Sequence, residues 1–246
     1  MTSAAQSLIT RVLAEPGSVC ITSSFQADCM VLLHLVRQQR PEIPVLFLET
    51  GYHFPETIGY RDRLTRDWNL NLRNLEATQS VADQEAAFGI LNQTAPDRCC
   101  KLRKVEPLFA GLADYDTWFT ALRREQSPTR AGLREEELFR LPTGHSLKKV
   151  SPLAAWTDKD VWRYMEQHNI PALPLYAHGY TSIGCAPCTR AVQPGEDHRA
   201  GRWWWEKGAP KECGMHCSIE TGGFEHELES ILGNGREAQS EESAAS

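Results

Sequence analysis

The 246-residue sequence contains no run of about 18 consecutive apolar residues, the length that a membrane-spanning helix needs. Residues 1–14 lack the basic stretch and apolar core that mark a secretory signal. A surplus of basic residues is also missing, because the formal net charge is −6. Binding of nucleic acid requires basic side chains that contact phosphates, so the charge argues against that class. These absences predict a cytoplasmic protein with neither a membrane nor a nucleic acid as partner.

Cysteine, in contrast, is abundant, with eight residues in the chain. In a protein without an export signal, cysteines more often serve as metal ligands or reactive thiols than as a disulfide framework. Hydrophobic residues make up 41% of the chain and charged residues 24%, which are ordinary fractions for a globular enzyme. The positions of the cysteines are therefore the main evidence for function.

Short β-rich segments alternate with helical segments along the first 170 residues. The expected strands are 18–23, 45–48, 116–122 and 148–153, and the expected helices are 30–36, 55–68 and 158–167. Pro55 begins the second helix, and Thr157 caps the third. This alternation predicts an α/β fold, a parallel twisted sheet with helices on both faces. Ligands of such sheets bind beyond the carboxyl ends of the strands, so the loops that follow Thr22, Leu48 and Leu122 should face one crevice.

The character of the chain changes after about residue 170, where glycine, proline, cysteine and tryptophan become frequent and hydrophobic periodicity fades. We expect one α/β domain over residues 1–232, in which residues 171–232 form an irregular C-terminal arm. Residues 233–246 are polar and lack an apolar period, which is typical of a disordered tail. The sequence leaves open whether the chain forms a homo-oligomer.

Four cysteines form two pairs, the adjacent Cys99 and Cys100 and the Cys-x-x-Cys pair Cys185 and Cys188. Four thiolates in two pairs suit one metal centre, either a structural zinc or a cubane iron–sulfur cluster. Zinc sites usually separate paired cysteines by roughly two to four residues. Neighbouring cysteines fit the separate iron corners of a larger cluster better, so the spacing favours iron–sulfur. The alternative is four buried thiols that pack as small hydrophobic side chains.

Another cysteine, Cys213, lies beside Gly214 and three residues before His216. A thiolate near basic groups is stabilised, and the thiolate is the nucleophilic form of the side chain. Taken alone, this motif is equally compatible with a turn that carries an incidental thiol.

Together these segments resemble the assimilatory APS/PAPS reductase family, the CysH-type sulfonucleotide reductases, over most of the chain. Residues 23–28 (SSFQAD) are similar to the family's modified pyrophosphate loop, and residues 48–57 (LETG with FPET) are similar to its second nucleotide loop. Residues 118–130 (WFTALRREQSPTR) are similar to its arginine-rich signature, and residues 212–216 (ECGMH) to its C-terminal catalytic motif. The two cysteine pairs resemble the cluster-bearing branch, which is mainly specific for adenosine 5′-phosphosulfate (APS).

The resemblance implies a fold of the adenine nucleotide alpha-hydrolase (pyrophosphatase-loop) type and one [4Fe–4S] cluster. The implied cluster ligands are Cys99, Cys100, Cys185 and Cys188. The implied catalytic residues are Cys213, as nucleophile, and His216. Phosphosulfate-binding or cluster-adjacent groups are expected at Lys104, Arg199, Arg202 and His216. Candidates for the nucleotide are Ser23, Ser24, Thr50, Gly51, Arg123 and Arg124.

The activity implied by the resemblance is reduction of APS to sulfite and AMP in sulfate assimilation. Cys213 attacks the sulfur and expels AMP, and the resulting S-sulfocysteine is released as sulfite by a dithiol donor, thioredoxin or glutaredoxin. The cluster need not change its oxidation state, because the dithiol supplies both electrons. Lys104 lies four residues after Cys100, so it could reach both the cluster and the substrate.

Two positions depart from the family pattern. Gln26 stands where some members have glycine, and Asp28-Cys29 replaces a more usual Glu-Asp or Glu-Gly. Cys217 also lies outside the pattern, either as a packing cysteine or as a thiol that oxidises with Cys213.

Three alternatives to an APS reductase remain at this stage. The first is a PAPS reductase with the same mechanism. The second is a tRNA-thiolating enzyme of the pyrophosphatase-loop class, whose Ser-Gly-Gly-x-Asp-Ser loop residues 23–28 do not match. The third is a zinc-stabilised binding module without catalysis.

Overall fold

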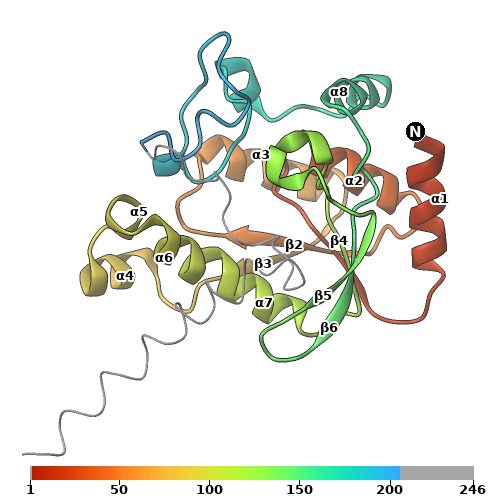
Figure 1. Cartoon of the computed structure of the whole chain (residues 1–246), viewed down its shortest axis with the longest axis horizontal. Coiled ribbons are helices and arrows are strands. Elements are labelled where there is room, and N and C mark those ends of the chain that lie inside the picture. Colours follow the sequence, from red (N-terminus) through yellow and green to blue (C-terminus); the bar gives the residue numbers. More distant parts are fainter. Residues whose placement is uncertain (1, 206–246) are drawn as a thin grey trace, which may run out of the picture.

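A six-stranded sheet forms the centre of the protein in a computed structural model that describes residues 2–205 (Figure 1). Its strands are β1 (Val19–Thr22), β2 (Pro44–Glu49), β3 (Asn71–Glu76), β4 (Thr117–Phe119), β5 (Glu136–Arg140) and β6 (Ser146–Val150). Their order is β3-β2-β1-β4-β6-β5. All neighbouring pairs are parallel except β5 and β6, which pair antiparallel. The predicted parallel sheet is thus confirmed, with one antiparallel edge strand that was not anticipated.

Helices lie on both faces of the sheet, as expected (Figure 1). One face carries α1 (Thr2–Leu13), α2 (Ala27–Arg37), α3 (Pro55–Asp67) and α8 (Asp158–Gln167). The other side carries α4 (Val81–Phe88), α5 (Leu91–Thr94), α6 (Pro96–Cys100), the π-helical turn η1 (Lys101–Val105) and α7 (Glu106–Leu112). None of the helices within residues 2–205 combines the length and apolarity that crossing a bilayer requires.

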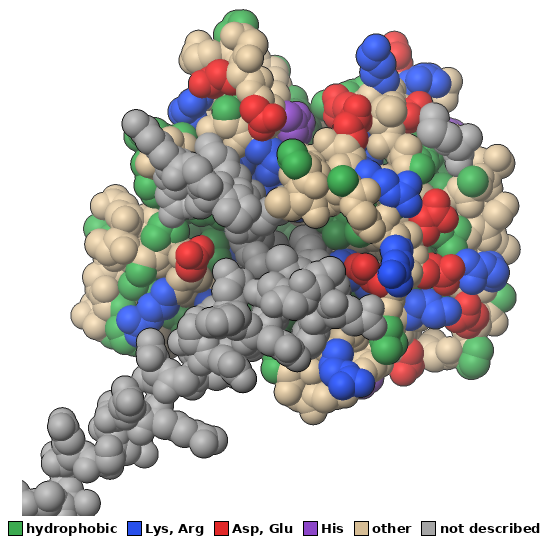
Figure 2. Space-filling view, viewed as in Figure 1, with side chains coloured by type: hydrophobic (Ala, Val, Ile, Leu, Met, Phe, Trp, Pro, Cys, Tyr) green, Lys and Arg blue, Asp and Glu red, His purple; other side chains and the backbone are tan. Residues whose placement is uncertain are grey.

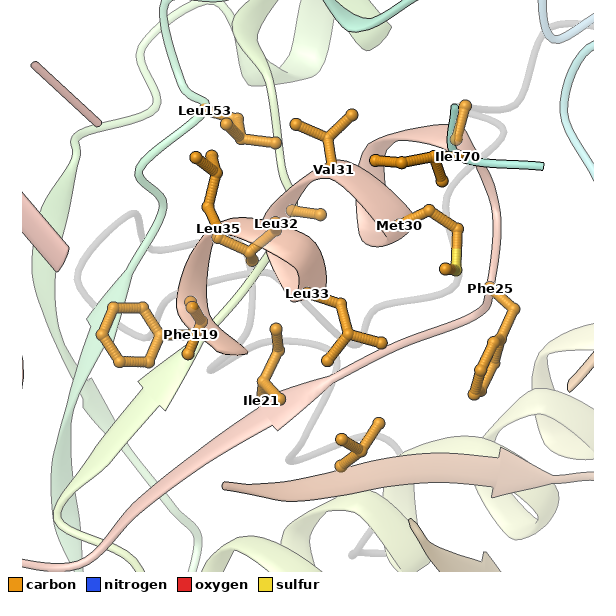
Figure 3. Close-up of a cluster of buried hydrophobic side chains, with 14 of the residues drawn as sticks. Ile21, Phe25, Met30, Val31, Leu32, Leu33, Leu35, Phe119, Leu153 and Ile170 are labelled. Atoms are coloured by element: carbon orange, nitrogen blue, oxygen red, sulfur yellow. The ribbon is translucent and has the colours of Figure 1, made fainter. Parts of the chain in front are cut away.

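Alternate residues of the strands belong to two separate hydrophobic cores, one on each face of the sheet, because successive side chains of a strand point to opposite faces. Ile21 and Phe119 join the core under α2, whereas Cys20 and Trp118 join the core under α7. Figure 3 shows the leucines of α2 packed over β1 and β4. Most of α2 is buried, which explains why its sequence is a nearly continuous apolar run.

The predicted starts of two helices are confirmed, whereas the helix expected at 30–36 begins earlier, at Ala27. Pro55 occupies the first turn of α3, and Thr157 caps α8 through a capping box with Asp160. In that box the Thr157 hydroxyl accepts from the Asp160 N–H, and the Asp160 carboxylate accepts from the Thr157 N–H at 2.9 Å. The strand expected at 116–122 is shorter and ends at Phe119, and the strand expected at 148–153 runs from Ser146 to Val150.

After α8, the part of the chain that the structure describes contains only the 3-10 turns η4 (Pro174–His178) and η5 (Ala186–Cys188) and an isolated bridge between Thr189 and Arg202. Two similar turns, η2 (Arg124–Gln126) and η3 (Pro128–Arg130), follow β4. The rest of the expected C-terminal arm and the tail 233–246 lie outside the described residues.

Candidate active site

The order of the strands reverses beside β1, because the chain runs from β1 through β2 to β3 and then returns to place β4 on the other side of β1. Open α/β sheets bind ligands at such a switch point. A cavity of about 220 Å³ lies there. Its lining includes Thr22, Leu48 and Leu122, so the three loops expected to face one crevice do so.

The loop after β1 contributes several residues to the lining of this cavity. Ser23 and Ser24 line it, as predicted for nucleotide-binding residues, and Asp28 and Cys29 of the first turn of α2 line it as well. Between them, Phe25 has φ +58°, a left-handed conformation that bulky residues rarely adopt. Its ring is fully buried and packs edge-on against Phe47 at 5.8 Å. Core packing therefore holds the loop in a strained shape, as often occurs at functional sites.

The loop after β2 contributes Thr50, which is buried and lines the cavity. Gly51 does not line it; its N–H donates to the Glu49 carboxylate at 3.0 Å, and its φ is +74°. A Cβ at Gly51 would lie 2.6 Å from Val81, so glycine is required here for the turn. His53 also lines the cavity, and burial lowers its pKa, which favours the neutral ring.

Lys104, Arg199 and Arg202, the three described cations predicted to bind phosphosulfate, all line this cavity. Lys104 and Arg202 are buried, and Nη1 of Arg199 and of Arg202 lie 3.3 and 3.4 Å from the Ser182 hydroxyl. Within residues 2–205, Nε of Arg202 is buried without a hydrogen-bond partner. Buried polar atoms are normally paired, so an anion in the cavity would complete this arrangement.

The grouping of these three cations contrasts with the mixed charges on one part of the surface (Figure 2). On the right-hand part of the face shown in Figure 2, basic and acidic side chains are interspersed. Arg202 approaches the backbone closely, because a Cβ at Gly184 would lie 2.5 Å from its guanidinium. Gly184 therefore makes room for the arginine.

The structure places Arg123 and Arg124 outside the lining of the cavity. Arg123 is buried and pairs with Asp28 at 2.5 Å, Glu125 at 3.1 Å and Asp158 at 3.3 Å. Arg124 is exposed, and its Nε donates to a backbone carbonyl. These contacts give Arg123 a structural role that joins α2 and α8 to the loop after β4.

Arg130 lines the cavity instead, although it was not singled out as a site residue from the sequence. The signal was present, because Arg130 belongs to the same arginine-rich segment. Cys29 and Gln26 were likewise missed as lining residues and were noted only as departures from the family pattern.

The two cysteine pairs lie around a second, smaller cavity next to the first. Its lining comprises Cys99, Cys100, Cys185, Cys188, Tyr52, Asn92, Pro96, Arg103, Lys104 and Trp203. Cys99, Cys185 and Cys188 are buried, and Cys100 is partly buried. The structure thus brings together four residues that are up to 89 positions apart in the sequence.

Burial dominates the thiol chemistry of this second cavity. It raises the pKa of Cys99, and it raises the pKa of Cys188 to about 11, with the nearby Cys185 as a further cause for both. Such thiols stay protonated unless a cation holds them as thiolates. Four soft sulfur donors around one cavity fit an iron–sulfur cluster. The type of donor atom fits a cluster, but the arrangement of the side chains does not yet form a metal site: within residues 2–205, no group of three or more His, Cys, Asp or Glu side chains is arranged to hold a metal ion.

Lys104 connects the two cavities, because it lines both. It lies in the π-helical turn η1, where the Glu106 N–H donates to the Lys101 carbonyl five residues earlier. π-Helical turns occur frequently at functional sites. Lys104 therefore lies between the four cysteines and the first cavity, and its contact with a cluster and a substrate stays a prediction. The predicted catalytic residues Cys213 and His216, and Cys217, lie outside the described residues.

Comparison with known proteins gives consistent results. A family model described as phosphoadenosine phosphosulfate reductase domain matches residues 18–191. The adenosine 5′-phosphosulfate reductase of Rhodococcus opacus is 48% identical over 82% of this chain and 79% of the relative. That of Burkholderia cepacia is 41% identical over 87% and 86%. The crystal structure of phosphoadenylyl-sulfate (PAPS) reductase from Candida auris, a phosphate complex, covers 77% of this chain and 90% of that one with a TM-score of 0.63; at 22% identity it shows the fold alone.

Proposed function

Because the chain belongs to the phosphoadenosine phosphosulfate reductase domain family, we propose that it is an oxidoreductase that reduces APS to sulfite and AMP in sulfate assimilation. The observation that carries this proposal is a cation-lined cavity that shares Lys104 with a cavity lined by four cysteines. The relatives named adenosine 5′-phosphosulfate reductase support APS, and not its 3′-phosphorylated form PAPS, as the substrate.

The residues of the first cavity bind and orient the substrate. The loop after β1 and the N-terminus of α2 suit the AMP portion, because helix N-terminal N–H groups favour anions. Lys104, Arg199 and Arg202 suit the phosphosulfate and neutralise the charge that the leaving AMP develops.

Chemistry begins at Cys213. Its thiolate attacks the sulfur of APS, an S–S bond forms, and the S–O bond to AMP breaks with its electron pair leaving on AMP. A thiolate of the donor, thioredoxin or glutaredoxin, then attacks the sulfur of Cys213 and expels sulfite. The second donor thiol resolves the mixed disulfide, so the donor is oxidised and Cys213 returns to the thiol state. His216, in the same motif, supplies a cation or a hydrogen-bond donor to the phosphosulfate.

Cys99, Cys100, Cys185 and Cys188 would hold one [4Fe–4S] cluster. When bound, the cluster supplies a fixed charge beside Lys104 and ties α6 to the C-terminal arm, and the dithiol donor supplies the electrons. We place the protein in the cytoplasm, where such donors are kept reduced. We also propose that residues 1–232 form a single domain.

The test is anaerobic purification followed by sulfite release from APS and from PAPS with thioredoxin. The protein should be brown, with an absorbance band at about 400 nm, because zinc is d¹⁰ and colourless whereas iron–sulfur clusters absorb. Cys213→Ser should abolish turnover and leave the colour intact, and Cys185→Ser should remove the colour. Cys20→Ala is the matched control, because Cys20 is buried in the sheet core and lines neither cavity. Turnover by Cys213→Ser would refute the mechanism, and preference for PAPS would establish the alternative substrate.

A further inference from the structure

Gln26 occupies the N-cap of α2, but its side chain does not cap the helix. Instead, it spans to the C-terminal arm, where its Nε2 donates to the Ile183 carbonyl at 2.9 Å and its Oε1 accepts from the Ile183 N–H at 2.8 Å. Nε2 also donates to the Ser24 hydroxyl at 3.0 Å. The amide thus pairs with the backbone N–H and C=O of one residue of the arm, while Nε2 also contacts the loop after β1.

Ile183 lies two residues before Cys185, which lines both cavities. A rigid hold on the Ile183 peptide therefore fixes where the Cys-x-x-Cys segment begins. Ile183 itself is buried in the core under α2, so packing fixes its side chain and the amide pair fixes its backbone.

Other contacts join the same two parts of the protein. The Ala27 N–H donates to the Tyr176 hydroxyl at 3.0 Å, and the Ala186 N–H donates to the Tyr52 carbonyl at 2.7 Å. The Thr50 hydroxyl lies 3.4 Å from the Cys185 sulfur. The loops after β1 and β2 thus both contact the segment that carries Cys185 and Cys188. Among these contacts, Gln26 is the side chain that makes two hydrogen bonds to the backbone of the segment.

We propose that Gln26 is a positioning residue that clasps the Cys-x-x-Cys segment to the nucleotide loop, so that a nucleotide in the first cavity and the cluster in the second stabilise each other. The proposal rests on the function proposed above for the two cavities. Coupling between two sites is reciprocal, so if a bound cluster strengthens nucleotide binding through this contact, a bound nucleotide strengthens retention of the cluster by the same factor. This role does not require Gln26 to touch the reacting atoms.

The experiment uses the anaerobic, cluster-loaded full chain and follows bleaching near 400 nm after addition of a ferrous-iron chelator. Rates are compared without nucleotide and with AMP at a concentration that saturates each variant, as determined by calorimetry. AMP should slow bleaching of the unaltered protein. In Gln26→Ala the ratio of the bleaching rate without AMP to the rate with AMP should fall about tenfold. This corresponds to about 1.4 kcal/mol, in the range expected for two lost neutral hydrogen bonds.

Gln38→Ala is the matched control, because Gln38 is an exposed glutamine at the other end of α2 and should leave the protection unchanged. If Gln26→Ala fails to fold, Gln26→Asn keeps the amide on a side chain one methylene shorter and should lose the protection equally. Full protection by AMP in a folded, coloured Gln26 variant would overturn the clasp while leaving the proposed function intact. Absence of protection in the unaltered protein would also overturn it. A colourless protein that releases no sulfite from APS would overturn the proposed function, and the clasp with it.

Discussion

Replacement of Arg123 by alanine should lower the stability of the protein and leave its affinity for APS nearly unchanged. The side chain of Arg123 is 3% exposed and pairs at 2.5 Å with Asp28, whose side chain is 20% exposed. It also donates to the Trp156 carbonyl at 3.2 Å and pairs with Asp158 at the start of α8. Removing one partner of a buried ion pair costs about 3–5 kcal/mol, because the other charge stays buried and uncompensated.

The partial exposure of Asp28 places the expected loss at the lower end, about 3 kcal/mol, because solvent screens its unpaired charge. For a chain of this size, each kcal/mol lowers Tm by about 2–4 °C, so a fall of about 6–12 °C is expected. Thermal unfolding of the cluster-loaded protein measures this change, and steady-state kinetics measures KM for APS. Adding Asp28→Asn to Arg123→Ala should recover part of the loss.

Arg130→Ala is the matched comparison, because Arg130 is half-buried and lines the ligand cavity. It should raise KM for APS and change Tm little. The reasoning is refuted if Arg123→Ala retains the Tm of the unaltered protein while KM for APS rises, since Arg123 would then bind substrate as the sequence indicated.

Further variants test other parts of the site and fold. Lys104→Ala should lower kcat/KM for APS by about 10²–10³-fold, as for other preorganised donors at a developing charge, and a rate within twofold of normal would contradict its placement. Gly184→Ala should raise KM for APS about tenfold, equivalent to about 1.4 kcal/mol, because the added Cβ displaces Arg202; an unchanged KM would argue against this contact. Thr157→Ala should cost about 1 kcal/mol at pH 7. The Thr157 hydroxyl also donates to the Asp160 carboxylate, and this bond lowers the pKa of Asp160. The part of the loss due to this bond is present above the unfolded pKa of about 4 and should disappear as pH falls through the lower folded value, whereas the cap of the Asp160 N–H does not depend on pH; Tm measured from pH 7 to 3 would show the difference.

Much of the fold could be predicted because its central strands and α2 are buried and therefore apolar. The strands β3 and β5 could not, since they lie at the two edges of the sheet. Their sequences, NLRNLE and EELFR, are largely polar, and most of their residues are only partly buried or exposed. Partnering with the neighbouring strand, which the sequence does not display, makes these segments extended.

The site shows a similar division. Spacing alone grouped the four cysteines, because metal ligands recur in recognisable pairs. The arginines of residues 123–130 could not be assigned in the same way, since two short 3-10 turns decide which guanidinium enters the cavity and which is buried among carboxylates. Charge density in a sequence indicates that anions are bound nearby, but the direction of each side chain depends on turns of a few residues.

The π-helical turn after the tandem cysteines has a consequence for how this segment tolerates length changes. Residues 96–112 follow one helical path, and η1 accommodates one residue more per hydrogen-bonded turn than the flanking α-helical segments. Deleting a single residue within Lys101–Val105 would remove the extra residue and restore a uniform α-helix, with the flanking segments α6 and α7 near their present orientation. The change would fall on the turn itself, so Lys104 would leave its place between the two cavities while the helix around it persists, and a one-residue deletion should damage the site more than the fold.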